Sequence, residues 1–308
     1  MSKDKDAAEK RLEDYNDVFA DLYNVLLFNA KRVILESDLT DARTSGQYKY
    51  EGELHAAERD TAKHWEKHDV ILAVLCIENQ SHSDNAMPLR VIGYDGVWYL
   101  GQAIQREEDQ RSKLPVQPFH PVVTLVLNFS NHRWIKNKSL LECLEIPDEL
   151  KPYVQDYKIN VVDVAFLPEE VIAKFESDFG IIADYMVKRR TNPDYVPEPR
   201  TIRHVDAFFK LLEAMSGERG LVEELQRQHI EGKEPTTMKD FFEERDRIAM
   251  AKGKAEGEAK GEANGKAKAV RTVMRKMRYS EDEAMDFLEL AGEEREACRN
   301  ALRELKIA

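Results

Sequence analysis

The chain has 308 residues, 42% of them hydrophobic, which is enough for one large domain or two smaller ones with a packed core. Its net charge is −12 and its pI is near 5.3, which argues against a protein that coats nucleic acid nonspecifically but leaves room for a local basic groove. The three cysteines, Cys76, Cys143 and Cys298, are widely spaced, so they favour reduced thiols over a disulfide framework or a zinc site.

The sequence shows neither a targeting signal nor a membrane-spanning segment. The N-terminal stretch MSKDKDAAEKRLEDYND is charged and lacks an apolar core. No apolar run approaches the roughly 20 residues that span a bilayer. We therefore expect a cytoplasmic protein that does not enter a membrane.

The first part of the chain alternates between helical and strand-like periodicity, which predicts an α/β sheet flanked by helices. We expect a helix over 7–34, a polar loop over 37–47, strands over 58–65, 69–78, 121–129 and 159–166, and a helix over 167–187. A further helix, capped by Ser83, Asp84 or Asn85 and carrying Pro88 in its first turns, follows the second strand.

The last hundred residues show no strand signal and predict an all-α C-terminal region. Three prolines within 188–201 mark a boundary before helices over 202–229 and 237–250, and two or three short helices fit 271–304. The expected organisation is therefore a first domain over 1–192, a helical extension over 193–250, a Gly-patterned segment over 251–270 and a small helical segment over 271–308.

Glycine recurs every four residues at positions 253, 257, 261 and 265 of the Gly-patterned segment. Two interpretations stay open. The segment is a flexible linker, since each helical glycine costs up to about 1 kcal/mol, or it is a helix whose small-residue stripe supports self-association or contact with a partner. Residues 252–278 also carry nine Lys or Arg and three Glu, so this stretch could contact phosphates or be a solvated helix face.

Two acidic residues lie at corresponding ends of neighbouring predicted strands. Asp60 stands at the start of one strand and Glu78 at the end of the next, so pairing of the two strands would bring the carboxylates together. With the backbone carbonyl of Asn79 they would form an oxygen-rich cage suited to Mg²⁺ or Mn²⁺. Gln80 would lie on the same side as Glu78 and orient a water molecule, and Asp17 could add a further acid, with Asp21 as a second candidate.

A simpler interpretation is that Glu78 ends its strand at the protein surface and that Asp60 is a solvated loop residue. The spacing D…E-x-Q over 18 residues does not decide between a metal site and this alternative. His64 and His68 are four residues apart, but the segment has strand character and the intervening glutamate is misplaced for a zinc-binding HExxH helix, so we do not expect zinc there.

A longer pattern carries more information than these pairs. The elements ERD, IENQ, MPLRVIGYD and PVVTLVLNF occur in this order, with NDVFADLYNVLLF before them, over roughly residues 15–190. This pattern resembles the PD-(D/E)XK nuclease family transposases, also called Rpn or YhgA-like recombination-promoting nucleases. The resemblance implies a restriction-endonuclease-like mixed sheet flanked by helices, and a Mg²⁺-dependent DNA endonuclease with a role in recombination or mobile DNA.

The resemblance also assigns residues. Asp60 matches the metal-binding Asp of the family, Glu78 the Glu of the E-x-K element and Asp17 the acid of the first helix. Arg90 and Tyr94 follow the motif and would contact the scissile phosphate.

Two positions depart from the family's pattern. Arg59 stands where the superfamily has Pro, and Gln80 stands at the superfamily's Lys position, a replacement that is usual in the branch that this chain resembles. A neutral amide cannot stabilise developing negative charge as an ammonium group does, so activity would be slow or depend on Arg59 or Arg90.

Two alternatives to an active endonuclease remain open at this point. The fold could be kept as a catalytically degraded DNA- or protein-binding module, which the neutral Gln80 and the acidic pI favour. The C-terminal helices could instead make the chain a homo-oligomer or a partner in a larger system, with the nuclease as its effector.

Overall fold

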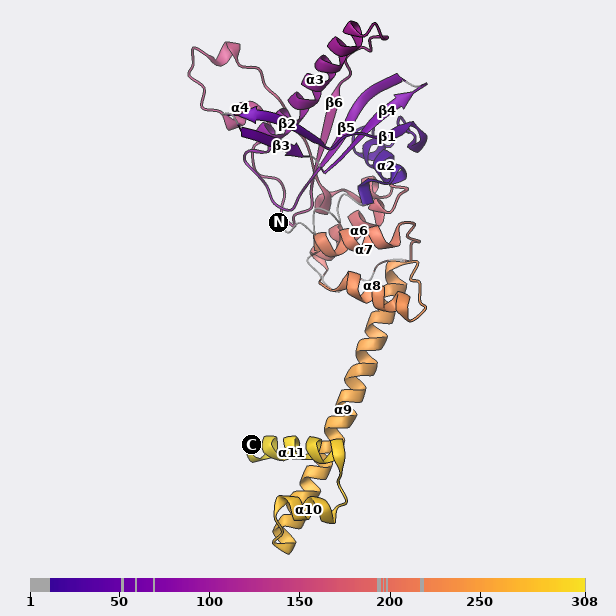
Figure 1. The fold of residues 1–308 in the computed structure, drawn as a ribbon, viewed down its shortest axis with the longest axis vertical. Helices are drawn as coiled ribbons and strands as arrows, with labels where there is room; N and C mark the ends of the chain where they lie inside the picture. Colours follow the sequence, from indigo (N-terminus) through magenta and orange to yellow (C-terminus); the bar gives the residue numbers. More distant parts are fainter. Residues whose placement is uncertain are drawn as a thin grey trace. The chain divides into compact units, whose positions relative to one another are not determined.

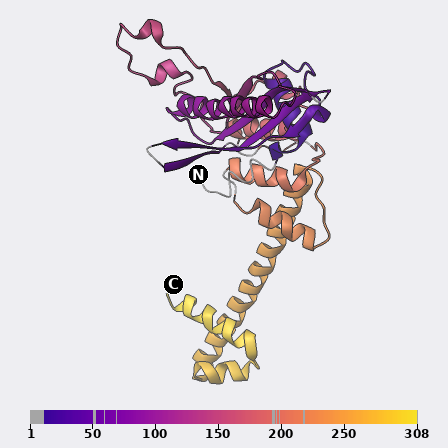
Figure 2. The ribbon, with the colours of Figure 1, turned by 45° about the horizontal axis from the view of Figure 1, so that its top comes forward.

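The structure is a computed structural model that describes residues 12–50, 53–58, 60–68, 70–192, 195, 197, 199–216 and 219–307. The chain forms two compact units, Met1–Lys239 and Asp240–Ala308. The first holds a mixed β-sheet with its helices (Figures 1 and 2), and the second is entirely helical over its described residues. The expected α/β class with an all-α C-terminal region is thereby confirmed.

The main sheet has five strands in the order β1-β4-β5-β6-β7. β1, β4 and β5 are antiparallel to one another, whereas β5, β6 and β7 run parallel, so the sheet is mixed. Their bounds are Leu39–Asp41, Thr61–Lys67, Val70–Gln80, Val122–Asn128 and Asn160–Asp163. β5 is the central strand, and its residues from 73 to 80 are all buried. This burial explains the apolar run AVLCI over 73–77, because a strand segment covered on both faces has no exposed side to fill with polar residues. The preceding Val70 and Leu72 are exposed.

Helices cover both faces of the sheet (Figure 2). α3 (Met87–Arg111) packs on one face through Met87 and Val91, with Pro88 in its first turn as the sequence predicted. α2 (Asn16–Leu26) covers the other face. Its Tyr23 hydroxyl lies 2.7 Å from the Cys76 carbonyl oxygen and accepts a hydrogen bond from the Cys76 N–H at 2.9 Å. This contact ties α2 to the centre of β5.

A second, two-stranded sheet interrupts the path from β1 to β4. Strands β2 (Ser45–Tyr50) and β3 (Glu53–Glu58) form an antiparallel hairpin that extends from the main sheet (Figure 2). The short helix α4 (Leu140–Cys143) and the 3-10 turn η2 (Lys151–Tyr153) lie between β6 and β7 in the chain. The chain after β7 is helical, with bounds η3 (Val164–Phe166), α5 (Glu169–Ile172), α6 (Phe179–Thr191), α7 (Val205–Ser216) and α8 (Leu221–Ile230).

Two expected elements differ from the structure near the N-terminus. The helix predicted over 7–34 is shorter, since α2 ends at Leu26 and the side chain of Asn24 holds the returning chain by bonding the backbone of Val33 and Ile34. Residues 7–11 lie outside the described residues. The predicted polar loop 37–47 instead contains η1 (Glu36–Asp38), β1 and the start of β2, because the edge of β4 offers a partner that local sequence does not reveal.

The single helix predicted over 167–187 is two helices with a bend between them. α5 ends at Ile172 and α6 begins at Phe179, and the side chain of Phe175 is buried in the intervening turn. The carboxylate of Asp21 accepts the backbone N–H of Ser177 at 2.7 Å, which fixes the bend from outside its own segment. A long-range bond thus interrupts a locally continuous helical pattern.

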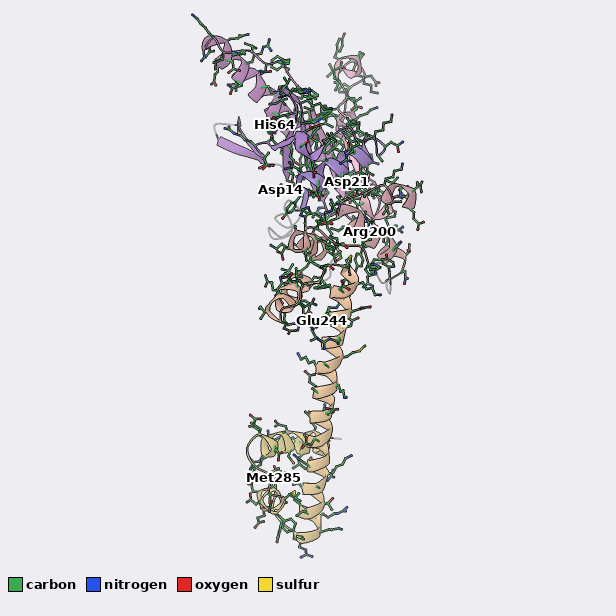
Figure 3. The ribbon with its side chains drawn as sticks, turned by 90° about the vertical axis from the view of Figure 1, so that its right-hand side faces the viewer. Asp14, Asp21, His64, Arg200, Glu244 and Met285 are labelled. Carbon is green, nitrogen blue, oxygen red and sulfur yellow. The ribbon has the colours of Figure 1, made fainter. Side chains whose placement is uncertain are left out.

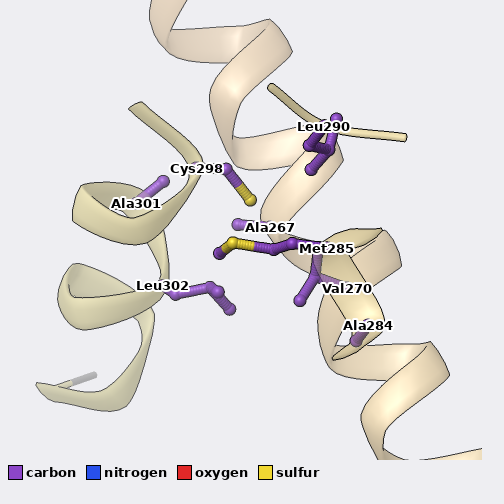
Figure 4. Packing of buried hydrophobic residues seen from close by; sticks show 8 residues of the cluster. All are labelled: Ala267, Val270, Ala284, Met285, Leu290, Cys298, Ala301 and Leu302. Carbon is purple, nitrogen blue, oxygen red and sulfur yellow. The ribbon is translucent and has the colours of Figure 1, made fainter. Parts of the chain in front are cut away.

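The second unit is built on α9 (Met238–Met277), a 40-residue helix that includes the glycine run. α10 (Glu281–Phe287) and α11 (Gly292–Ile307) pack on its C-terminal half around a small apolar core (Figure 4). That core consists of Ala267, Val270, Ala284, Met285, Leu290, Cys298, Ala301 and Leu302. The glycine run is therefore helical rather than a flexible linker. Its proposed role in self-association stays a prediction.

None of the helices within the described ranges combines the length and the apolar character that crossing a bilayer requires.

The close packing at Gly180 generates a prediction about stability. A Cβ atom built at this position would lie 2.5 Å from the Cβ of Phe175, too close for either to stay in place. We expect Gly180→Ala to lower the free energy of unfolding by about 1–3 kcal/mol, as measured by denaturant titration. Gly101→Ala on α3, where nothing lies within 4 Å, is the matched control and should raise stability by up to about 1 kcal/mol. Equal effects of the two substitutions would contradict the packing argument.

Candidate functional site

Strand pairing brings Asp60 and Glu78 to the same level of the sheet. β4 begins at Thr61, which pairs with Ile77 in the antiparallel ladder, so the residue before β4 continues the register opposite Glu78. The backbone N–H of Asn79 donates a hydrogen bond of 2.6 Å to Oδ2 of Asp60. This bond fixes the Asp60 carboxylate at the end of β5, and it makes Asp60 and Glu78 neighbours although 18 positions separate them.

The alternation of side chains decides which face of the sheet each residue occupies. Ala62 and Cys76 pack together in an apolar cluster beside Trp98 of α3. Glu78 and Gln80 follow Cys76 at intervals of two residues, so they lie on the face that α3 covers. The site is therefore bounded by the ends of two strands and by the first turns of one helix.

Glu78 is buried rather than placed at the surface. Its residue exposure is 1%, and β5 continues through Asn79 and Gln80 instead of breaking into a polar turn. This overturns the simpler interpretation of Glu78 as a solvated strand end. A buried carboxylate costs several kcal/mol unless a charge or hydrogen bonds compensate it. The protein supplies one compensating charge from α3, where Nη2 of Arg90 lies 3.8 Å from Oε2 of Glu78.

Arg90 reaches three partners at once. Besides Glu78, its Nη1 lies 3.5 Å from Oδ2 of Asp84 and its Nε lies 3.4 Å from the hydroxyl of Tyr94 one helical turn later. Burial opposes the charge of Arg90, but the contacts with Tyr94, Glu78 and Asp84 together raise the pKa of its guanidinium. The side chain is still 39% exposed, so it lies between the buried carboxylate and solvent. The other expected phosphate contact, Arg59, lies outside the described residues.

A third carboxylate reaches this region from a residue that the sequence analysis missed. Glu13 is fully buried, and its Oε2 accepts a hydrogen bond of 2.8 Å from the side-chain amide of Asn79. Consecutive side chains of a strand point to opposite faces of the sheet, so Asn79 faces away from Glu78 and from α3. Glu13, which bonds Asn79, therefore approaches from the face that α2 covers. The sequence carried only the weak signal of a glutamate beside the apolar Leu12. Nothing local distinguishes such a residue from a solvated one.

Asp17, the predicted further acid of the site, contacts the segment that leads into α7. Its carboxylate lies 3.0 Å from Nε2 of His204 and 3.5 Å from Arg203, in the segment that leads into α7. The ring of His204 also stacks on Tyr15 with 3.7 Å between centroids. The structure thus engages Asp17 in joining α2 to the segment before α7. Two neighbouring acids contact the strands that carry Asp60 and Glu78, because Glu13 bonds Asn79 and Asp14 lies 3.4 Å from the hydroxyl of Thr61.

Asp21, labelled in Figure 3, is also used for packing. It accepts the backbone N–H of Glu176 at 3.0 Å besides that of Ser177, and burial raises the pKa of its carboxyl group above the ordinary value. Asp17 and Asp21 line a cavity of about 320 Å³ whose wall mixes acidic and basic side chains. This mixture gives the cavity no preference for one charge of ligand.

The histidine pair does not form a joint site. His64 lies in β4 with its ring edge toward Trp98, 5.8 Å between centroids, and burial lowers the pKa of its imidazole. His68 lies in the following turn at φ 51°. Across the described residues, no group of three or more His, Cys, Asp or Glu side chains is arranged to hold a metal ion.

The donors at the strand ends nevertheless suit a hard divalent cation. Mg²⁺ is held by one or two protein carboxylates and keeps several water ligands, so two carboxylates at one level of the sheet are sufficient. Asp60 and Glu78 supply oxygen donors at one level of the sheet, so these two residues fit Mg²⁺ or Mn²⁺. The Asn79 carbonyl and Gln80 are the further predicted contributors.

The chain that forms this α/β sheet is similar to one known protein family. Residues 66–197 match the family described as "Putative transposase, YhgA-like", which confirms the resemblance inferred from the sequence. The matched segment includes Glu78, Gln80, Arg90 and Tyr94, whereas Asp60 lies six residues before it. No curated protein and no solved structure matches the chain.

The contact between Asn79 and Glu13 predicts a pH-dependent effect on stability. Asn79→Asp would replace the amide donor by a second buried carboxylate, and we expect a loss of at least about 3 kcal/mol in unfolding free energy at pH 7. The loss should shrink toward pH 4, because one carboxyl group can then take up a proton and donate to the other. Thermal unfolding at several pH values measures this. In a Glu13→Gln background the same substitution should cost clearly less, and an equal cost there would contradict the pairing.

Proposed function

We propose that this protein is a metal-dependent DNA endonuclease that hydrolyses phosphodiester bonds. The observation that carries the proposal is the placement of Asp60 level with a buried Glu78 that faces the cationic Arg90. Keeping a carboxylate buried at the end of a strand is costly, and a cation-binding role gives a reason for that cost. The match to a family of transposases supports DNA as the substrate and a connection with recombination or mobile elements.

In this proposal Asp60 and Glu78 hold Mg²⁺ or Mn²⁺, with the backbone carbonyl of Asn79 as a further ligand. The bound ion would polarise the scissile phosphate and lower the pKa of a water molecule. Gln80 lies on the same face as Glu78 and would orient that water. Arg90, which is partly exposed at the rim of the site, would contact the phosphate together with Tyr94.

The neutral side chain at position 80 limits the expected rate. Gln80 is 6% exposed and lies two residues beyond Glu78, where the family pattern has Lys. An amide can hydrogen-bond to the attacking water but cannot balance a developing negative charge. We therefore propose a slow enzyme whose charge stabilisation comes from the metal ion and Arg90.

A second candidate function is a binding module that keeps the fold without efficient chemistry. Two observations favour it: Gln80 at the Lys position and the engagement of Arg90 by two carboxylates, Glu78 and Asp84. Such a protein would bind DNA or a protein partner without cleaving phosphodiester bonds. The two candidates differ in whether cleavage occurs and whether it depends on the carboxylates.

Plasmid nicking tests the metal site directly. We expect the wild-type protein to nick supercoiled DNA with Mg²⁺ or Mn²⁺ but not with EDTA. Asp60→Asn and Glu78→Gln should each reduce the rate by at least about 100-fold, because the metal contributes several kcal/mol to the transition state. Asp148→Asn, which alters a surface carboxylate whose side chain is 88% exposed, is the control and should leave the rate unchanged. Cleavage that survives both site substitutions would point to a contaminating nuclease. DNA binding without any cleavage would favour the binding module.

The role of position 80 generates a separate prediction. Gln80→Lys would place an ammonium group where the family pattern has one, and we expect the single-turnover cleavage rate to rise by about tenfold or more. Gln80→Leu, which removes the hydrogen bond to water without adding charge, should lower the rate. A rate for Gln80→Lys at or below that of the wild type, with the fold intact by circular dichroism, would contradict the proposed role of this position.

A further inference from the structure

Besides contacting a phosphate, Arg90 can affect how tightly the site binds a metal ion. This inference rests on the proposed function. The guanidinium contributes a positive charge to the buried carboxylate of Glu78, which is the carboxylate that would ligate a divalent cation. We propose that Arg90 is the counter-ion of Glu78 in the metal-free protein and that it competes with the divalent cation for this carboxylate. The competition would set the affinity of the metal site.

The geometry of the contact allows Arg90 to leave. The 3.8 Å between Nη2 and Oε2 of Glu78 is longer than a hydrogen bond, so the attraction is mainly electrostatic. The contacts with Asp84 at 3.5 Å and Tyr94 at 3.4 Å are also long. A side chain held by three weak contacts and 39% exposed can turn toward solvent without breaking a strong bond.

Asp84 is the alternative partner of Arg90 when a cation occupies Glu78. Its Oδ1 accepts the backbone N–H of Ala86 at 2.8 Å just before α3, which fixes the carboxylate beside the helix, while its Oδ2 faces Arg90. When a divalent cation binds Glu78, repulsion between the two cations would favour the contact of Arg90 with Asp84. At that position the guanidinium also remains close enough to the site to meet a phosphate.

The positive charge of Arg90 predicts that removing this side chain changes the metal affinity in the opposite direction from removing a metal ligand. Removing a metal ligand weakens binding, whereas removing a competing cation strengthens it. We expect Arg90→Gln to increase the affinity for Mn²⁺ by about tenfold, since loss of a unit charge at this distance changes the electrostatic potential at Glu78 substantially. Arg90→Lys, which keeps the charge, should stay much closer to the wild type.

The experiment measures Mn²⁺ binding to the full chain without DNA, by electron paramagnetic resonance of the free ion. Glu78→Gln should abolish binding at the site. Arg106→Gln removes the same charge from the same helix, sixteen residues further on, and is the control that should match the wild type. Tighter binding by Arg90→Gln alone supports the proposal.

A second measurement covers the case in which Arg90→Gln is destabilised, because Glu78 then loses a compensating charge. Mn²⁺ should raise the melting temperature of Arg90→Gln more than that of the wild type, since the ion binds the folded state more tightly. An equal or smaller rise would overturn the proposal.

The outcomes separate this inference from the proposed function. If the wild type binds Mn²⁺ through Glu78 and Arg90→Gln binds no more tightly, the competition is overturned while the metal site stands. If neither protein binds Mn²⁺, the metal site itself is overturned, and the competition with it. If only Arg90→Gln binds, Arg90 acts as a block on the site, which supports the proposal.

Discussion

The burial of one carboxylate organises the first unit of this protein. Glu78 lies two residues before the end of the central strand with only 1% of its surface exposed, and a charge in that position needs a compensating partner. α3 supplies Arg90, and the next residue of the strand, Asn79, fixes Asp60 through its backbone and Glu13 through its side chain. Helix, strand and N-terminal segment thus converge on one strand end. The burial of Glu78 is the point of this unit where the fold accepts an electrostatic cost.

The two faces of the sheet have different tasks. On one face, α2 is held against the sheet by packing and by the hydroxyl of Tyr23, which bonds the backbone of Cys76 at the centre of β5. Asp17 and Asp21 serve this side by bonding the segments that lead into the later helices, through His204 and through the backbone of Ser177. The face under α3 carries Glu78 and Gln80 toward a helix end that is partly open to solvent.

The second unit is governed by helix formation rather than by a large core. Its long helix α9 is exposed at every residue from 249 to 262, and pairs of Lys and Glu four residues apart, such as Lys252 and Glu256, support it there. The apolar core of α9, α10 and α11 is small and built from alanines, aliphatic residues and Cys298 (Figure 4). Three glycines, Gly253, Gly257 and Gly261, weaken the exposed stretch, and within the described chain a Cβ atom built at any of them would meet nothing within 4 Å.

The sequence by itself determined the alternation of strands and helices, the strand identity of the apolar run at β5, and the meeting of Asp60 with Glu78. These follow from local periodicity and from the tendency of consecutive strands to pair. Tertiary structure alone decided that Glu78 is buried, that Glu13 bonds Asn79, and that the helix predicted over 167–187 bends. Each of these depends on a partner far away in the chain, such as Asn79 for Glu13 or Asp21 for the bend, and periodicity carries no information about partners at that distance.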